Sequence, residues 1–177
     1  MQHNNQLGFR STLLMGVLVA MGTQLPLSAA TTLSATSLRA VKVVRETAAT
    51  TTASTVWVNV PGATTTLTIP GLTTDLVLAH YTAESVCYGA SGWCPVRILL
   101  NGVEMDPAAG TDFAFDSSDG GTASLSSWES HAVQRSRAYT NSLTFPVNVT
   151  IQVQYMTTVA GMTFRLDDWH LTVQQFH

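Results

Sequence analysis

The sequence predicts an all-β protein, an antiparallel β-sandwich of the jelly-roll kind, and three observations lead to this prediction. Its 177 residues are 45% hydrophobic and only 11% charged, against roughly 25% charged in ordinary globular domains. Thr, Ser and Ala are abundant where charged residues would be expected. Thr favours pleated strands, and both Ser and Thr are poor helix formers. Short apolar or alternating runs recur between turn residues, with no convincing helical stretch. The tight turns favour antiparallel pairing, since parallel strands need long crossovers.

Residues 1–30 are predicted to be a signal peptide. Arg10 precedes the apolar run 13–21, and small residues occupy 28–30. A basic start, a short apolar core and small residues at the cleavage site are the parts of a secretory leader. The run is shorter than the roughly 20 apolar residues of a membrane span, and no later run is longer. We therefore expect cleavage near Thr31, a secreted or periplasmic protein and no transmembrane segment.

Two regions are expected after the leader. Residues 31–54 are predicted to be a flexible N-terminal segment with one strand, over 39–47, followed by small residues at 48–54 that act as a linker. Residues 55–177 are predicted to form the β-sandwich domain. The sequence contains no internal repeat, and its length after removal of the leader suits a single domain.

Within this domain, each strand is expected where an apolar or alternating run lies between turn residues. Asn101-Gly102 is the strongest predictor of a hairpin, and Pro61-Gly62 predicts another turn. The run 75–83 alternates little, which predicts a strand buried on both faces. The other strands are expected at 55–60, 64–69, 95–100, 103–105, 128–139 and 147–155, with 162–166 and 169–173 as a final pair or one bulged strand.

Cys87 and Cys94 are the only cysteines, and an even count in an exported chain predicts a disulfide. Gly89 and Gly92 lie between them and allow a tight turn. Closing so short a loop is expected to stabilise the fold by about 2.5 kcal/mol. A redox pair or zinc site is the weaker interpretation, because C-x-x-C is absent and two thiols make an incomplete zinc site.

The charge of the chain argues against two classes of partner. The formal net charge is −3, with only eight Lys and Arg residues. These basic residues are scattered along the sequence, so they form no stripe that could neutralise a phosphate backbone. We therefore expect no binding to nucleic acid and no attraction to an anionic membrane.

Four stretches of the sequence carry a resemblance. They are Ala83–Tyr88 together with Trp93–Ile98, then Asp112–Ser117, Trp128–Arg135 and Phe164–Val173. Together they resemble small exported bacterial β-sandwich proteins of unassigned function, over most of the chain from about residue 55 onward. The resemblance implies the sandwich fold and an exported bacterial setting, and it brings no activity, ligand or catalytic residue with it.

The loop 106–121 is rich in aspartate and could hold calcium. Asp112, Asp116 and Asp119 are the candidate ligands, because calcium takes six to eight oxygen ligands. Their spacing is not that of an EF-hand. The alternative is a loop in which each aspartate caps a turn by bonding its own backbone. Calcium is the only cofactor that the sequence suggests.

The sequence contains many carboxylates, histidines and serines that could act in catalysis, but they form no known catalytic motif. Neither a Gly-x-Ser-x-Gly elbow nor His-Glu-x-x-His occurs. Ion pairs with arginine, such as Arg165 with Glu84 or Asp168, and ordinary structural histidines account for these residues better, so no catalytic residue is assigned and an enzyme is disfavoured. The candidates considered for glycoside hydrolysis, zinc binding or a Ser-His-Asp arrangement are Glu84, Glu129, Asp167, Asp168, His80, His131, His170, Ser127 and Ser130.

Trp93 and Tyr88 are the candidate ligand-binding residues. Both belong to the hairpin that the disulfide would close, and exposed aromatic side chains hold sugar rings by apolar stacking. The alternative for Trp93 is a side chain that covers the sandwich edge. If the hairpin and the acidic loop share one end of the sandwich, they would form one ligand surface.

The sequence thus favours an exported ligand-binding module whose partner is a glycan or another extracellular surface ligand. The alternative is a structural or interaction protein of the cell envelope without a small-molecule ligand. The oligomeric state stays open. A partly exposed Trp93 and a common end for the two loops are the geometric conditions for the first interpretation.

Overall fold

The computed structural model describes residues 32–110, 113–122 and 128–177. The predicted signal peptide at 1–30 and the candidate ligand Asp112 lie outside these ranges. Every regular element in the described ranges is a β-strand, which confirms the predicted all-β class. The same ranges contain no helix with the length and hydropathy needed to cross a membrane.

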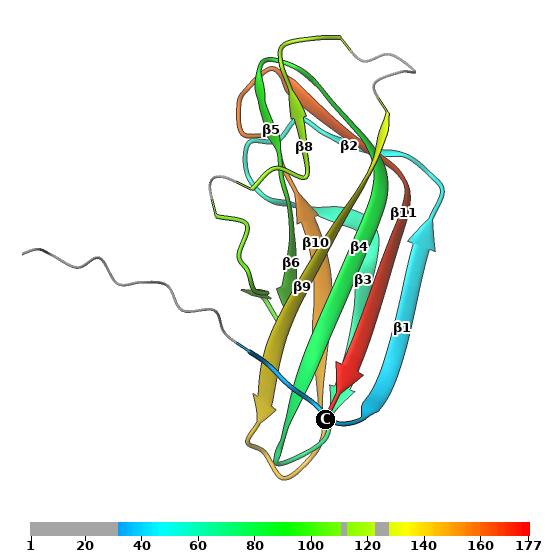
Figure 1. The fold of residues 1–177 in the computed structure, drawn as a ribbon, viewed down its shortest axis with the longest axis vertical. Coiled ribbons are helices and arrows are strands. Elements are labelled where there is room, and N and C mark those ends of the chain that lie inside the picture. The colour runs from blue at the N-terminus through cyan, green and yellow to red at the C-terminus, as the bar shows by residue number, and fades with distance from the viewer. Residues whose placement is uncertain (1–31, 111–112, 123–127) are drawn as a thin grey trace, which may run out of the picture. The chain divides into compact units, whose positions relative to one another are not determined.

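Two antiparallel sheets hold most of the strands (Figure 1). The first sheet has the order β1 (Leu38–Glu46), β11 (Met162–Phe176), β4 (Thr73–Gly89) and β9 (Glu129–Asn141), with β2 (Thr50–Thr52) also paired to β11. The second sheet has the order β3 (Val58–Ile69), β10 (Val147–Tyr155), β6 (Val96–Leu100) and β7 (Val103–Glu104). A separate two-stranded sheet pairs β5 (Gly92–Cys94) with β8 (Asp116–Ser118).

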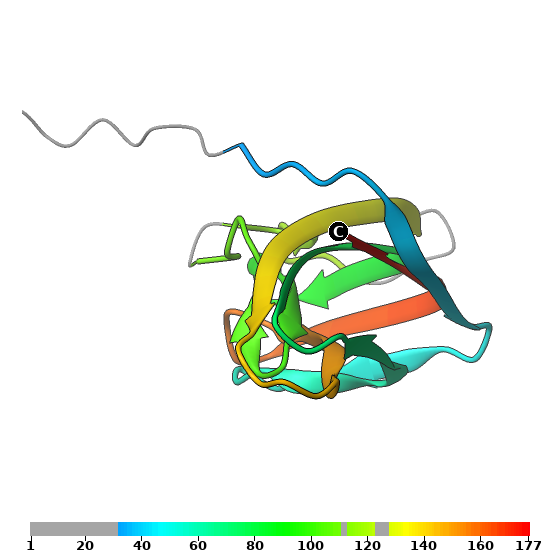
Figure 2. The same cartoon turned by 90° about the horizontal axis from the view of Figure 1, so that it is seen from below.

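The order of the main strands is that of a jelly roll. Apart from β2 and the small sheet, the chain changes sheet at every step except the β6–β7 hairpin. The last strand, β11, lies between β1 and β4, and β10 lies between β3 and β6. Two sheets connected in this way, with early and late strands side by side, form a double Greek key. Figure 2 shows the sheets wrapped around a common interior, so the predicted jelly-roll-like sandwich is confirmed.

The core between the sheets comes from the predicted alternation. In β10, Val149, Ile151, Val153 and Tyr155 are buried, as expected for a strand with one face inward. In β11 the inward positions change from even to odd at an irregularity between Asp167 and His170. The last two predicted segments are therefore one bulged strand, and the bulge explains the change of phase.

Strand β4 differs from its prediction because it is buried on one face only. Val77, Ala79 and Tyr81 point into the core, whereas Leu78 is half-buried and His80 is exposed on the outer face. The apolar run looked continuous because Leu76 and Leu78, which alternate with the buried positions, are also apolar. An apolar side chain on a sheet surface costs little, so alternation of burial need not appear as alternation of polarity.

The start of the sandwich also differs from the prediction. Pro61-Gly62 forms no hairpin but lies inside β3, where the register with β10 shifts between Gln152 and Gln154. Gly62 has a φ of +76°, a conformation that glycine adopts without strain. The predicted linker 48–54 contains β2, which pairs with β11, so the first sheet includes residues ahead of 55.

Strand β4 spans the sandwich from end to end and fixes its two poles (Figure 1). Its first residue, Thr73, pairs with Asn141 of β9, and its last residue, Gly89, pairs with Met162 of β11. The connection 142–146 therefore lies at the start of β4. The hairpin with the two cysteines lies at the other pole, which we call the disulfide end.

Candidate functional site

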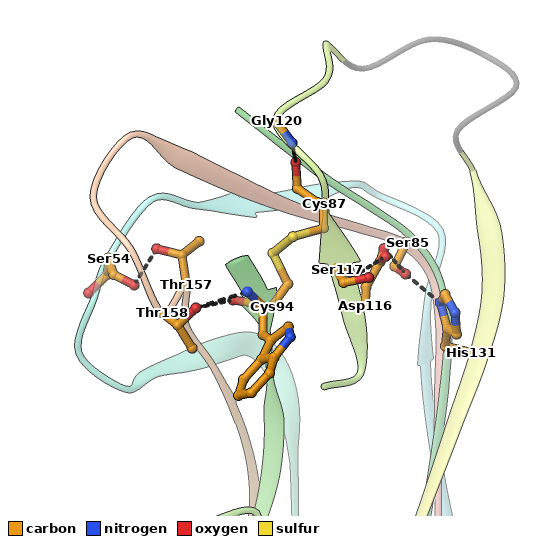
Figure 3. The surroundings of a disulfide bond; sticks show 12 residues. Ser54, Ser85, Cys87, Cys94, Asp116, Ser117, Gly120, His131, Thr157 and Thr158 are labelled. Carbon is orange, nitrogen blue, oxygen red and sulfur yellow. Dashed lines mark hydrogen bonds between the residues drawn. A yellow bond between two sulfur atoms is a disulfide. The ribbon is translucent and has the colours of Figure 1, made fainter. Parts of the chain in front are cut away.

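The predicted disulfide is present and closes the hairpin between β4 and β5 (Figure 3). The Cα atoms of Cys87 and Cys94 are 6.1 Å apart, and both side chains belong to the hydrophobic core. Gly89, at the end of β4, has a φ of +99° and lies against the carbonyl oxygen of Gly161. No side chain fits there, which confirms the turn role predicted for this glycine.

The hairpin and the acidic loop lie side by side at the disulfide end. Strand β5 pairs with β8, so that Trp93 is opposite Ser117 and Cys94 is opposite Asp116. The amide of Gly89 also donates to the carbonyl of Gly121 at 2.9 Å. The geometric condition of a common end for the two loops is therefore met.

Trp93 combines a fixed backbone with a partly exposed indole. The residue is 41% exposed. Its amide donates to Thr158 Oγ1 at 2.9 Å, and its carbonyl accepts from the amide of Thr158 at 2.9 Å. Thr158 lies beyond β10 on one side of β5, and β8 lies on the other. The backbone of Trp93 is thus held from both sides while its ring meets solvent, which is the second geometric condition.

A cavity of about 360 Å³ opens beside this hairpin. Two of its lining residues lie close to Trp93: Thr158 is hydrogen-bonded to it, and Pro95 follows it by two residues in the sequence. We call it the aromatic cavity. Its lining consists of Trp57, Pro95, Gly110, Phe113, Met156 and Thr158.

Two arginines stack on the aromatic walls of this cavity. The guanidinium carbon of Arg97 lies 4.5 Å from the ring centre of Trp57, and that of Arg135 lies 4.5 Å from the ring centre of Phe113. Contacts of this kind attract a cation to the ring face. Gln154 Oε1 accepts from Arg97 Nε and Nη2 at 2.8 and 2.7 Å. Burial lowers the pKa of Arg135, but arginine stays protonated at neutral pH.

Sequence reasoning did not identify this cavity. Trp57 was expected in the strand 55–60, but it precedes β3, and Val56 is exposed in the same connection. No local sequence pattern marks Trp57 and Phe113 as neighbours, because they lie in segments far apart in the chain.

Tyr88 lies away from the aromatic cavity. It is half-buried near the end of β4, opposite Thr163 of β11. Its neighbour Cys87 points into the core, so the alternation of the strand directs Tyr88 to the outer face. The structure therefore places Trp93, but not Tyr88, beside the cavity.

The acidic loop is only partly described. Asp116 Oδ2 accepts from Ser85 Oγ at 2.7 Å and its Oδ1 accepts from the amide of Ser117 at 2.6 Å, while Asp119 is exposed. Within the described ranges, no group of three or more His, Cys, Asp or Glu side chains is arranged to hold a metal ion. Because Asp112 lies outside them, calcium binding stays a prediction.

A chain of polar groups beside the disulfide has the composition of a catalytic triad (Figure 3). Ser85 Oγ lies 2.9 Å from His131 Nδ1, and His131 Nε2 lies 3.4 Å from Glu129 Oε2. The Ser85 hydroxyl gives its hydrogen to Asp116, so it accepts from His131. Ser85 is fully buried on β4 and cannot reach a substrate. This network joins β4, β8 and β9, and no catalytic role is assigned to it.

The remaining catalytic candidates occupy ordinary structural positions. Ser130 is exposed, and Ser127 lies outside the described residues. His80 is opposite Thr172, and His170 is opposite Thr82 in the same pair of strands. Both histidines are therefore cross-strand neighbours of threonines in the first sheet.

Arg137 and Arg165 each lie close to a carboxylate. Arg137 Nη1 lies 3.6 Å from Asp106 Oδ2. Arg165 was expected to pair with Glu84 or Asp168, but its Nη2 lies 3.9 Å from Asp167 Oδ2. The bulge in β11 gives Asp168 a φ of 44°, which takes it out of the alternating pattern that the expectation assumed.

Comparison with known proteins adds little to this geometry. No protein-family model matches the chain, and no curated protein matches it. Among solved structures, dimeric latent PorU from Porphyromonas gingivalis is similar at a TM-score of 0.39 and 13% sequence identity. The match covers 82% of this chain and 14% of that chain. A likeness of this size carries no argument about function.

Proposed function

We propose that this chain is an exported ligand-binding module that holds a carbohydrate at its disulfide end, with Trp93 and the aromatic cavity as the contact surface. One observation carries the proposal. The indole of Trp93 is partly exposed, on a backbone held from both sides, directly beside a cavity with two aromatic walls. Ligand sites are typically concave and aromatic, with a few polar groups that set orientation.

The chemistry of the surface suits a sugar. A pyranose ring has an apolar face of C–H groups that stacks on an indole, and its hydroxyls need polar partners. Thr158 supplies a hydroxyl and Gly110 supplies backbone groups at the cavity. Stacking and burial of one such aromatic contribute roughly 1–3 kcal/mol.

The rigidity of the hairpin supports binding over a merely structural role for Trp93. The Cys87–Cys94 bond, the pairing with β8 and the contacts with Thr158 all restrict the same three-residue strand. Groups that are ordered before binding lose less conformational entropy when a ligand arrives. A ring that only covered the core would not need to be partly in solvent.

Export is supported by two independent features. Residues 1–30 have the pattern of a secretory leader, and the structure has a disulfide between its only cysteines. Disulfides persist in oxidising compartments such as the periplasm or the cell exterior. A carbohydrate ligand is available in both places.

A structural role in the cell envelope is the second candidate, and the first sheet supplies an observation for it. Strand β1 is an edge strand, and Val41 and Val43 are exposed on it. An open edge can pair with another chain. Lys42 between these valines opposes such pairing, because charged residues on an edge disfavour addition of a strand.

A glycan-array screen tests the proposal. The protein from residue 31 onward is applied with calcium and with a chelator, so that the same experiment tests the calcium prediction. We expect binding to a defined group of glycans and weaker binding by Trp93→Ala to that same group. Signals at background for every glycan, in both conditions, would contradict the proposal.

A further inference from the structure

We propose that the carbohydrate bound at the disulfide end carries a carboxylate, as in a uronic acid, and that Arg135 recognises it. This inference rests on the binding function proposed above. It is drawn from a buried cation that no described carboxylate contacts, from its contact with a wall of the aromatic cavity, and from the balance of charge around that wall.

Arg135 is a buried cation that contacts no carboxylate of the described residues. It lies on β9 and is only 7% exposed. Its Nη1 donates to the carbonyl of Gln134 at 3.0 Å, and its Nε has no hydrogen-bond partner among the described residues. Buried charges are normally paired, because removing an ion from water is unfavourable. An arginine left without a paired carboxylate therefore points to an anion supplied from outside.

The cation adjoins the cavity through Phe113. The guanidinium covers the ring that forms one wall of the cavity. Phe113 lies outside the strands, so no sheet pairing fixes its backbone. Arg135 itself does not line the cavity, so the proposal requires the Phe113 side chain to rotate and let a ligand reach the guanidinium.

The surrounding charges favour an anion. Among the described residues, three arginines (Arg97, Arg135 and Arg137) and two carboxylates (Glu104 and Asp106) gather here, which gives three positive charges against two negative charges. Both carboxylates already have partners: Glu104 bonds the amide of Ala109 and lies 3.5 Å from Arg97, and Asp106 pairs with Arg137. Of these three arginines, Arg135 is the one that pairs with no carboxylate of the described residues.

The N–H groups of Arg135 that have no hydrogen-bond partner among the described residues match a carboxylate in geometry. Guanidinium nitrogens form a planar fork that binds the two oxygens of a carboxylate with parallel hydrogen bonds. With Nη1 used by Gln134, the Nε edge of the fork is free. A neutral sugar hydroxyl would satisfy one N–H but would leave the buried charge without a counterion.

The test compares acids with matched esters. Oligomers of galacturonate, glucuronate and mannuronate are titrated against the protein, each beside its methyl ester, which keeps the sugar and removes the charge. We expect at least one acid to bind about tenfold or more tightly than its ester. If no acid binds more tightly than its ester, the inference is overturned, while binding to neutral glycans would leave the proposed function intact.

Three variants assign the effect to Arg135. Arg135→Gln should lose the preference for the acid but still bind the ester, and Arg135→Lys, which keeps the charge without the fork, should retain part of it. Arg165→Gln is the matched control, because Arg165 also stacks on an aromatic ring, that of Trp128 at 5.1 Å, and should keep the full preference. An Arg135→Gln protein that is folded and still prefers the acid would overturn the assignment. If that variant does not fold, the Lys variant and the acid–ester comparison decide.

Discussion

Thr158 and Trp93 hold each other through one hydroxyl group that both accepts and donates. The amide of Trp93 donates to Thr158 Oγ1 at 2.9 Å, and the same hydroxyl donates to the carbonyl of Trp93 at 3.1 Å. Because Thr158 also lines the aromatic cavity, a change at this one side chain is transmitted to both parts of the proposed surface.

Thr158→Val should therefore weaken binding more than it affects folding. Valine keeps the shape of threonine but offers no hydroxyl, and a net hydrogen bond at a solvent-accessible site contributes about 0.5–1 kcal/mol. We expect a two- to fivefold loss of glycan affinity in calorimetric titration and a small decrease in melting temperature. Thr158→Ser keeps the hydroxyl and is the control. An equal loss in both variants would show that the hydroxyl is not responsible.

The disulfide should contribute both stability and binding. Replacing Cys87 and Cys94 together by alanine should lower the free energy of unfolding by about 2–3 kcal/mol in urea titrations. Glycan affinity should fall as well, since β5 loses one of its restraints. Each single variant leaves one unpaired thiol. Labelling of that thiol by an alkylating reagent is the positive control for the absence of free thiols in the wild-type protein. Unchanged stability in the double variant would contradict this account.

Tyr81 and Tyr155 form a natural pair for testing buried hydroxyls. Tyr81 is fully buried and its hydroxyl has no partner among the described residues, whereas the Tyr155 hydroxyl lies 3.0 Å from Thr50 Oγ1. Removing an unsatisfied group is neutral or favourable, and removing a bonded one costs about 1 kcal/mol. Tyr81→Phe should therefore unfold at the same or higher urea concentration than wild type. Tyr155→Phe should unfold at a lower one, and the opposite order would refute this explanation.

The same tyrosine predicts a weakness at alkaline pH. The pKa of Tyr81 is raised above its ordinary value of 10.0, chiefly because the hydroxyl is buried and secondly because Tyr155 is nearby. The folded state thus keeps the proton that the unfolded chain releases, so stability is unaffected below pH 10 and declines as the pH rises above about 10. Melting temperatures measured from pH 8 to 11.5 should fall more steeply for wild type than for Tyr81→Phe. Parallel curves would exclude Tyr81 as the cause.

The sequence predicted the fold well wherever one face of a strand is apolar and the other polar. The alternation of Val149, Ile151 and Val153 located β10 at its observed bounds. The same reasoning failed at Gly62 and at Asp168, because a bulge inserts residues without breaking the strand. A prediction that assumes unbroken alternation between inward and outward residues cannot distinguish such a bulge from a turn.

Only the part of the site that lies within one short segment of the sequence could be predicted. Trp93 could be inferred because the disulfide, the turn and the aromatic all lie within one short segment. Trp57, Phe113 and Arg135 lie in three segments far apart in the sequence, and the crossings of the jelly roll bring them together. No local pattern indicates which loops of a sandwich become neighbours, so the cavity required the structure.

Calorimetric titration of one pair of variants tests the central claim most directly. Trp93→Ala removes the exposed indole at the disulfide end, and Phe145→Ala removes a ring that is 58% exposed at the opposite pole. With the strongest glycan from the array, Trp93→Ala should bind about tenfold more weakly or worse, by the roughly 1–3 kcal/mol of a stacked aromatic, and Phe145→Ala should bind like wild type. Full affinity in Trp93→Ala together with lost affinity in Phe145→Ala would place the binding surface at the other end and contradict the account.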